Sequence, residues 1–198
     1  MPTLDLSLPH SWTANILDRP PLILPARQFV YPRQAEEVER GALELLVRPA
    51  SGSEFLATCA LGFSDPAAPT GVWSCPNPDW LCAAAGGYVY LIDTTHPEQW
   101  HQVEYRPVLE VRPLVQHALL LFVGHHSMLA WGPAGQAWQT GRLSSEGVII
   151  HAIDGSTLRG SGWDLRTDKE FEFSVDLRTG LHTIAGMGTS ATPADDPP

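Results

Sequence analysis

The sequence has little positive charge. Of its 198 residues only 12 are Lys or Arg, against 22 Asp or Glu, which gives a formal net charge of −10, and Lys169 is the sole lysine. A protein that tracks a nucleic-acid backbone needs a basic patch, so we exclude nucleic acid as a partner. No apolar run approaches the roughly 18 residues of a membrane span. We therefore expect a soluble protein with no membrane partner.

Signals for export and for disulfide bonding are also missing. The first ten residues contain no basic stretch followed by an apolar segment, as a signal peptide would. The three cysteines, Cys59, Cys75 and Cys82, are an odd number and form no Cys-x-x-Cys motif. This pattern predicts buried free thiols in a reducing cytoplasm, with a Cys75–Cys82 link as the alternative. A cytoplasmic location is the expectation.

Glycine and proline, by contrast, are abundant, at 17 and 18 residues. Such frequent chain breakers exclude a long-helix protein and favour many short elements joined by turns. Residues 1–31, with a proline cluster at their centre, are predicted to form an extended arm rather than a helix or a central strand. Residues 32–41 begin with Pro and end with Gly, which indicates one short helix. Residues 185–198 have the composition of a disordered tail.

Short β-strands are predicted through the remainder of the chain. Apolar runs of strand length alternate there with turn residues, which is typical of antiparallel sheets. The predicted strands are 42–48, 54–63, 80–85, 88–93, 99–105, 108–113, 117–124, 128–131, 137–143, 148–153, 158–162 and 170–177. We therefore expect residues 32–184 to form a single all-β domain of short antiparallel strands.

A weak internal repeat of about 38 residues runs through this domain. Gly86 and Gly124 are 38 residues apart, and Trp100 and Trp138 have the same separation. Around each glycine, an apolar strand, a turn and a second apolar strand follow one another, and a partial third copy begins at Ser156. Four strands in about 40 residues is the size of a propeller blade.

These segments resemble known propeller repeats. Residues 87–94 (GYVYLIDT) and 173–180 (FSVDLRTG) are similar to the strand-and-turn signature of quinoprotein blades, and Trp163-Asp164 resembles the WD dipeptide, although it comes early in its copy. The whole chain also resembles a family of uncharacterised bacterial proteins. The resemblance implies a partial or small β-propeller-like fold, with an irregular β-sandwich as the alternative. Open sheet edges associate readily, so a homodimer through such edges is expected.

Standard catalytic motifs are missing, but one set of polar residues could form a site. His125 and His126 lie in a predicted turn, and Asp93 and Asp164 lie near other predicted turns. If the four met at the loop tips, they could serve a hydrolase or an isomerase, with or without a metal. The alternative is that the histidines are exposed turn residues and the aspartates cap local N–H groups. On this alternative neither a metal site nor a cofactor is predicted.

Aromatic residues offer a second kind of site. Tyr88, Tyr90, Trp131 and Trp163 could line a groove for an aromatic, sugar or peptide ligand, because such rings give a large contact area. The alternative is that the seven tryptophans pack between neighbouring units. The leading hypothesis is a non-enzymatic binding or scaffold module that recognises a protein or small ligand through its loop tips. The enzyme with a His/Asp site is the alternative.

Overall fold

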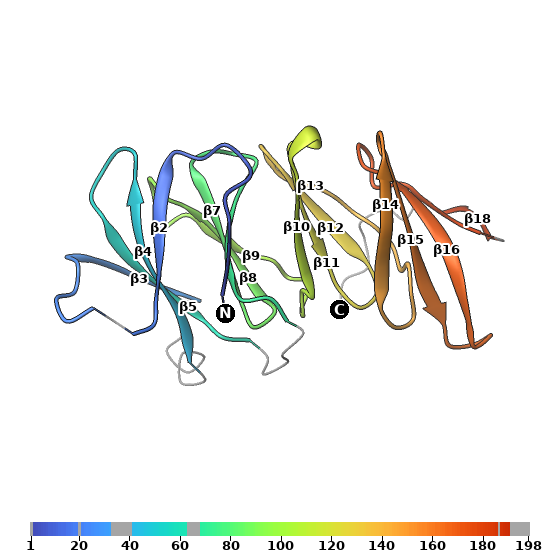
Figure 1. Ribbon diagram of the computed structural model, residues 1–198, viewed down its shortest axis with the longest axis horizontal. Coiled ribbons are helices and arrows are strands. Elements are labelled where there is room, and N and C mark those ends of the chain that lie inside the picture. Colours follow the sequence, from blue (N-terminus) through green and yellow to red (C-terminus); the bar gives the residue numbers. More distant parts are fainter. Residues whose placement is uncertain (1, 20, 33–40, 63–67, 186, 191–198) are drawn as a thin grey trace.

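The protein is an all-β assembly of four sheets. The computed structural model describes residues 2–19, 21–32, 41–62, 68–185 and 187–190 (Figure 1). Within these ranges the chain forms 18 strands and one short 3-10 turn. The helix predicted over 32–41 falls almost wholly outside the described residues, as does the end of the predicted tail, 191–198. Across the described ranges, no helix has the length and apolarity needed to cross a membrane.

The four sheets follow one another along the chain, except that the first strand, β1, belongs to the second sheet. The first sheet has the order β2 (Trp12–Leu17), β4 (Ala42–Pro49), β5 (Phe55–Ala60), β3 (Arg27–Tyr31). The second has the order β1 (Thr3–Asp5), β6 (Gly71–Ser74), β7 (Trp80–Ala85), β8 (Tyr88–Asp93), β9 (Trp100–Gln102). The third consists of β10 (Glu110–Leu114), β11 (Leu119–Val123), β12 (Met128–Gly132) and β13 (Gly135–Gln139), with the 3-10 turn η1 (Val115–His117) between its first two strands. The fourth consists of β14 (Val148–Asp154), β15 (Thr157–Asp164), β16 (Lys169–Asp176), β17 (His182–Ile184) and β18 (Met187–Ser190).

The sheets stand face to face in a row, as successive blades do in an open propeller (Figure 1). Three apolar clusters fill the spaces between neighbouring sheets. Strand β7 contributes side chains to two of these clusters. Leu81 and Ala83 belong to the cluster with the first sheet, whereas Cys82 and Ala84 belong to the cluster with the third. Because side chains alternate between faces, a sheet buried on both faces needs a continuous apolar run. The strands of the two middle sheets have uninterrupted apolar sequences because both faces of these sheets are buried.

The glycines of the weak repeat occupy equivalent turns. Gly86 lies in the hairpin turn between β7 and β8, and Gly124 lies in the turn between β11 and β12. The strand before each hairpin, β6 or β10, pairs antiparallel with the first strand of that hairpin. The second and third sheets therefore share one strand order. The all-β prediction with short antiparallel strands is confirmed.

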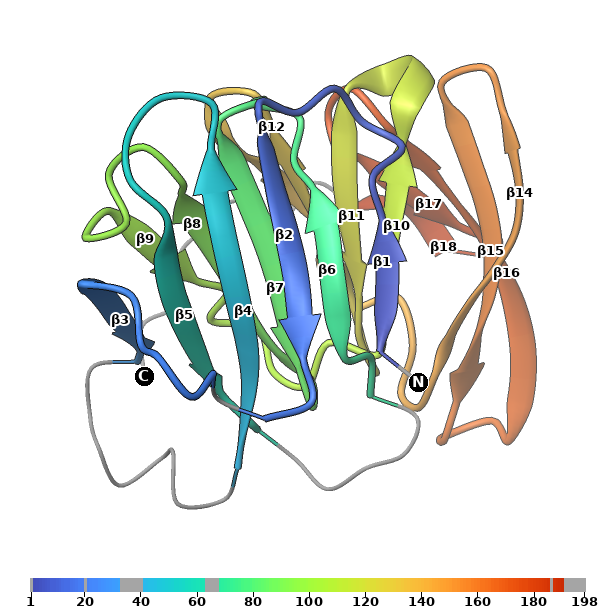
Figure 2. The ribbon, with the colours of Figure 1, turned by 60° about the vertical axis from the view of Figure 1, so that its left-hand side comes forward.

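The N-terminal segment differs from the extended arm that the prolines indicated. It contributes three strands, and each is an edge strand: β1 runs parallel to β6 (Figure 2), β2 pairs with β4, and β3 runs parallel to β5. Pro21 and Pro25 lie in the loop between β2 and β3, where they cost no ladder hydrogen bond. At the other end of the chain, β18 pairs with β17 inside the segment expected to be a tail.

Candidate functional site

The hairpin turns of three sheets lie along one edge of the row, at one end of the strands, and we call this edge the hairpin rim. It comprises the β7–β8 turn, the β11–β12 turn and the β15–β16 turn at residues 165–168. Backbone hydrogen bonds tie neighbouring units together here: Val108 N–H donates to Gly87 C=O at 3.0 Å, and Leu109 N–H donates to Val123 C=O at 2.7 Å. The loop tips of three sheets thus lie along one rim.

The connection from β13 to β14 is fixed between two of these hairpins. The His126 carbonyl accepts hydrogen bonds from the backbone N–H of Leu143 (2.7 Å) and of Ser144 (3.2 Å). On the other side, the Ser144 hydroxyl oxygen accepts from Trp163 N–H at 2.8 Å, and Ser145 N–H donates to Trp163 C=O at 2.7 Å. The connection is therefore held in place beside the β15–β16 hairpin by hydrogen bonds on both sides.

A cavity of about 480 Å³ lies between this connection and the hairpin. That volume lies within the usual range for small-molecule sites. Its lining combines apolar side chains with three of the chain's twelve basic residues. The lining consists of Arg142, Leu143, Ser144, Ser145, Asp164, Arg166, Thr167, Lys169, Glu170, Phe171, Ile184 and Ala185. We call it the rim cavity.

Some of the charged groups around the rim cavity already form hydrogen bonds within the protein, and others do not. Arg142 Nε donates to the Ser144 carbonyl at 3.1 Å, so one donor of this guanidinium is already bonded within the β13–β14 connection. Asp164 accepts from Arg166 N–H at 3.0 Å and from the Thr167 hydroxyl at 2.9 Å. These bonds, with the Arg166 amide first among them, hold the pKa of Asp164 below its usual value. Its carboxylate is thus a structural part of the turn.

Arg166 and Lys169 are the two cations left available at the rim cavity. Within the described part of the chain, neither side chain has an ion pair or a hydrogen bond. Asp168 between them adopts the left-handed conformation, with φ of 54°, which closes the hairpin tightly. The hairpin therefore presents two positive groups at the mouth of a partly apolar cavity, and the charge of Arg166 also helps to lower the pKa of Asp164.

The structure does not bring the four candidate catalytic residues together. His125, His126 and Asp164 lie at the hairpin rim, but Asp93 pairs with Trp80 at the far ends of β7 and β8. Those strands have six residues each, so Asp93 lies about 17 Å along the strand from the turn. Among the described residues, no three His, Cys, Asp or Glu side chains are placed to hold a metal ion.

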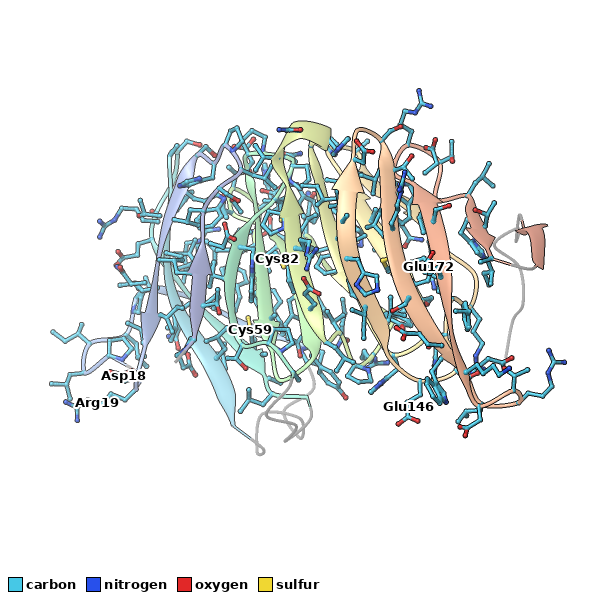
Figure 3. The ribbon with its side chains drawn as sticks, turned by 45° about the vertical axis from the view of Figure 1, so that its right-hand side comes forward. Asp18, Arg19, Cys59, Cys82, Glu146 and Glu172 are labelled. Atoms are coloured by element: carbon cyan, nitrogen blue, oxygen red, sulfur yellow. The ribbon has the colours of Figure 1, made fainter. Side chains whose placement is uncertain are left out.

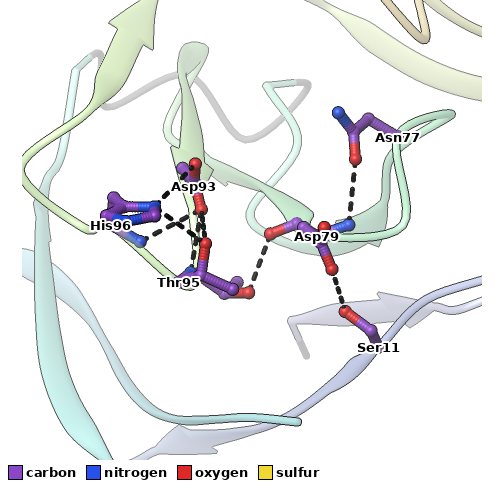
Figure 4. A network of polar contacts seen from close by, with 7 residues as sticks. Ser11, Asn77, Asp79, Asp93, Thr95 and His96 are labelled. Carbon is purple, nitrogen blue, oxygen red and sulfur yellow. Dashed lines mark hydrogen bonds and ion pairs between the residues drawn. The ribbon is translucent and has the colours of Figure 1, made fainter. Parts of the chain in front are cut away.

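Asp93 instead belongs to a polar network at the edge of the molecule opposite to the hairpin rim (Figure 4). Its Oδ1 accepts from the Thr95 hydroxyl at 2.7 Å, from Thr95 N–H at 2.8 Å and from His96 N–H at 3.1 Å. Burial alone would raise the pKa of Asp93, but these hydrogen bonds outweigh it and the pKa lies below its usual value. In the same network, the Ser11 hydroxyl donates to Asp79 Oδ1 at 2.5 Å. The network shapes a turn and attaches the N-terminal segment to the second sheet.

The four candidate aromatic residues lie in different layers and line no common groove. Tyr88 and Tyr90 point from β8 into the cluster with the first sheet, where the Tyr90 hydroxyl donates to the Ala60 carbonyl at 3.0 Å. Trp131 packs against the second cluster, with its ring 5.7 Å from that of His101. Trp163 lies on the outward face of the fourth sheet. Alternation along each strand and stacking of the sheets separate them.

The residues of the rim cavity were missed by reasoning from the sequence. Lys169 looks like a solvated charge because Asp168 and Glu170 flank it. Its closeness to residues 142–145 arises only because β14 and β15 form a hairpin that returns the chain to the hairpin rim. The clustering of Arg142, Arg166 and Lys169 within 28 residues of an otherwise acidic protein was the available signal.

Comparisons with known proteins assign no family. No family model matches the chain, and no curated protein matches it. A crystal structure of the N-terminal domain of Nup159 aligns with a TM-score of 0.36 and 12% sequence identity, covering 98% of this chain and 54% of that one. The chain thus spans about half the length of that solved structure. At this similarity the likeness assigns neither family nor function, and the resemblance to bacterial, quinoprotein-type and WD-type sequences stays a prediction.

Proposed function

We propose that the protein is a non-enzymatic binding module whose ligand is a small organic anion with an apolar body. The rim cavity is the single observation that carries this proposal. It joins apolar lining, from Phe171 and Ile184, to the cations Arg166 and Lys169, whose side chains make no hydrogen bond among the described residues. Sites for small molecules commonly have this composition, with a mostly apolar wall and a few polar groups that orient the ligand.

Electrostatics favour an anion at this position over a neutral or cationic ligand. The protein has a net charge of −10, so an anion is repelled over most of its surface and needs a local cluster of positive charge. The rim cavity supplies one, since two carboxylates accompany three cations and Asp164 is already bonded to its own turn. A carboxylate there would accept charge-assisted hydrogen bonds from Arg166 and Lys169. Its hydrocarbon portion would lie against Phe171 and Ile184, which are both partly exposed in the cavity.

Calorimetric titration with octanoate tests the proposal, with octylammonium as the probe of opposite charge. We expect octanoate to bind and octylammonium not to bind. Arg166→Gln and Lys169→Gln should each raise the octanoate dissociation constant about tenfold, the effect of losing one charge-assisted hydrogen bond. Arg178→Gln is the matched control, because Arg178 is exposed and lies beyond the other end of β16. Equal binding of the two probes, or an equal effect of Arg178→Gln, would refute the proposal.

We further propose a cytoplasmic setting and an origin of the units in quinoprotein-type or WD-type repeats of a bacterial family. The free, buried state of Cys59, Cys75 and Cys82 supports the first, because such thiols accord with a reducing compartment. The shared strand order of the second and third sheets supports the second. Thiol titration in urea, on protein prepared from its native cells without reductant, tests the setting: three thiols per chain support it, and fewer contradict it.

A further inference from the structure

Exposed apolar side chains gather at the two ends of the row of sheets. Of the eleven large hydrophobic side chains exposed among the described residues, nine belong to the segments of the first and fourth sheets. They are Leu22, Ile23, Leu24, Val30, Ile149, Ile153, Trp163, Leu165 and Leu181. The two middle sheets bury both faces, whereas each end sheet has a described neighbour on one face only. The outward faces of the end sheets are therefore the unfilled positions of the stack (Figure 1).

The outward face of the fourth sheet has an apolar hollow with acidic borders. Ile149 pairs with Ser161 on this face, and Trp163 lies two residues further along the same strand. Together they line a hollow of about 300 Å³ that Glu146 and Glu170 also line. Ile149 is 57% exposed, which is unusual for an isoleucine in the body of a strand. The pattern is apolar at the centre and negative at the border.

The loop between β2 and β3 has the complementary pattern. Leu22, Ile23 and Leu24 are 105%, 88% and 50% exposed, and the chain bends at the first two of them. Arg19 precedes them and Arg27 follows. The loop is thus apolar at its centre with an arginine on each side, and Asp18 lies next to Arg19. Scattered exposed apolar residues are ordinary, but three in succession on a projecting loop indicate a contact surface.

Loop and hollow lie toward the same end of the sheets. Strand β2 ends at Leu17 beside Glu44, close to where Gly62 N–H donates to the Ala85 carbonyl just before the β7–β8 turn. Trp163 on β15 and Glu170 on β16 are opposite each other in the sheet, next to the β15–β16 turn of the hairpin rim. Figure 3 shows Arg19 and Glu146 toward one edge of the molecule, at opposite ends of the row. A second copy that continues the row would therefore bring its loop to the level of the hollow.

We propose that a second copy of this chain covers the outward face of the fourth sheet, packing head to tail through its first sheet and its β2–β3 loop. Leu22, Ile23 and Leu24 enter the hollow lined by Ile149 and Trp163, while Arg19 and Arg27 face Glu146 and Glu170. A head-to-tail contact forms a ring if its rotation closes. Two copies supply eight sheets, which lies within the blade numbers of closed propellers. The closed ring leaves neither end face exposed.

The test is the mass of the full-length protein measured by light scattering over a range of concentrations. Wild type should have twice the monomer mass. Ile23→Asp and Ile149→Asp should each raise the dimer dissociation constant at least about tenfold, because each places a carboxylate at an apolar contact. Val115→Asp is the matched control, since Val115 is 51% exposed but belongs to the third sheet's turn. All three positions are exposed, so each variant should keep the thermal midpoint of the wild type when the proteins are compared at concentrations where all of them are monomeric.

A mixture of the two variants distinguishes head-to-tail packing from packing of one face against itself. In a ring of either variant alone, both interfaces carry a substitution. In a mixed ring, one interface joins the intact loop of Ile149→Asp to the intact hollow of Ile23→Asp, and the other carries both substitutions. The mixture should form dimers at concentrations where each variant is monomeric. A monomeric wild type, undiminished dimerisation of both variants, or a mixture that stays monomeric would each overturn the proposal.

Discussion

Replacing Gly124 by alanine tests how the hairpin rim is built. The backbone at Gly124 does not adopt a left-handed conformation, so alanine is permitted there by its torsion angles. However, a Cβ at this position would overlap the Tyr105 ring, at its Cε1, Cζ and hydroxyl oxygen. That hydroxyl accepts hydrogen bonds from the backbone N–H of His126 and of Ser127, each at 3.1 Å. Accommodating one methyl group therefore requires the ring, and both hydrogen bonds, to move.

The cost can be worked out from these contacts. Two weakened hydrogen bonds cost about 1 kcal/mol each. Overpacking adds about 1–2 kcal/mol, and the lower entropy of alanine in the unfolded chain returns about 1 kcal/mol. We expect Gly124→Ala to lower the free energy of unfolding by about 2–3 kcal/mol. For a chain of this length, that corresponds to a fall of about 5–10 °C in the thermal midpoint.

Gly132→Ala is the matched control, read by urea denaturation alongside Gly124→Ala. A Cβ at Gly132 meets its nearest atom, Ala137 Cβ, at 3.6 Å, which is ordinary contact. Its free energy of unfolding should stay the same or rise by up to about 1 kcal/mol, because the entropy gain of alanine is not offset by a clash. In a Tyr105→Ala background the ring is absent, so adding Gly124→Ala should cost almost nothing more. Equal stability of Gly124→Ala and Gly132→Ala would refute the reasoning.

Three further predictions concern buried polar groups. Trp138→Phe should lower the free energy of unfolding by about 1–3 kcal/mol, because it removes the 2.7 Å buried hydrogen bond from Nε1 to the Leu177 carbonyl. An unchanged midpoint in urea denaturation would contradict this prediction. Burial lowers the pKa of His182 below its ordinary value of 6.5, so the folded state resists protonation. The stability it contributes is complete above pH 6.5 and is lost as the pH falls further, since the unfolded chain takes up the proton first; His182→Gln should flatten that part of the stability profile. Burial also raises the pKa of all three thiols, so a thiol reagent should label none in the native protein and three in urea; rapid native labelling would show that the thiols are accessible.

The sequence was most informative where local pattern and stacking agree. The strands at 80–85 and 88–93 were predicted with the bounds that the structure shows, because their apolar residues fill both faces of a middle sheet. Gly86 and Gly124 have the equivalent positions that their separation of 38 residues indicated. Strands β1, β2 and β3 were missed because they are short edge strands near prolines, and edge pairing depends on partners distant in the chain.

The candidate sites were less accessible from the sequence. Tyr88 and Tyr90 are chemically suited to ligand binding, but only the placement of the first sheet reveals that they are core residues. Asp93 and Asp164 both lie at strand ends, yet the direction of each strand puts them at opposite ends of their sheets. The rim cavity depends on contacts between residues 142–145 and the β15–β16 hairpin, and no local motif encodes such a contact.

Nitrogen-15 correlation spectra recorded during a titration with octanoate test the proposed binding module most directly. If the rim cavity is the binding site, the largest shifts will belong to the amides of residues 142–145 and 164–171, and they will saturate together with one dissociation constant. The same titration with octylammonium should leave those amides unmoved. An absence of saturable shifts, or shifts centred on the end that carries Asp93 and His96, would contradict the proposed function.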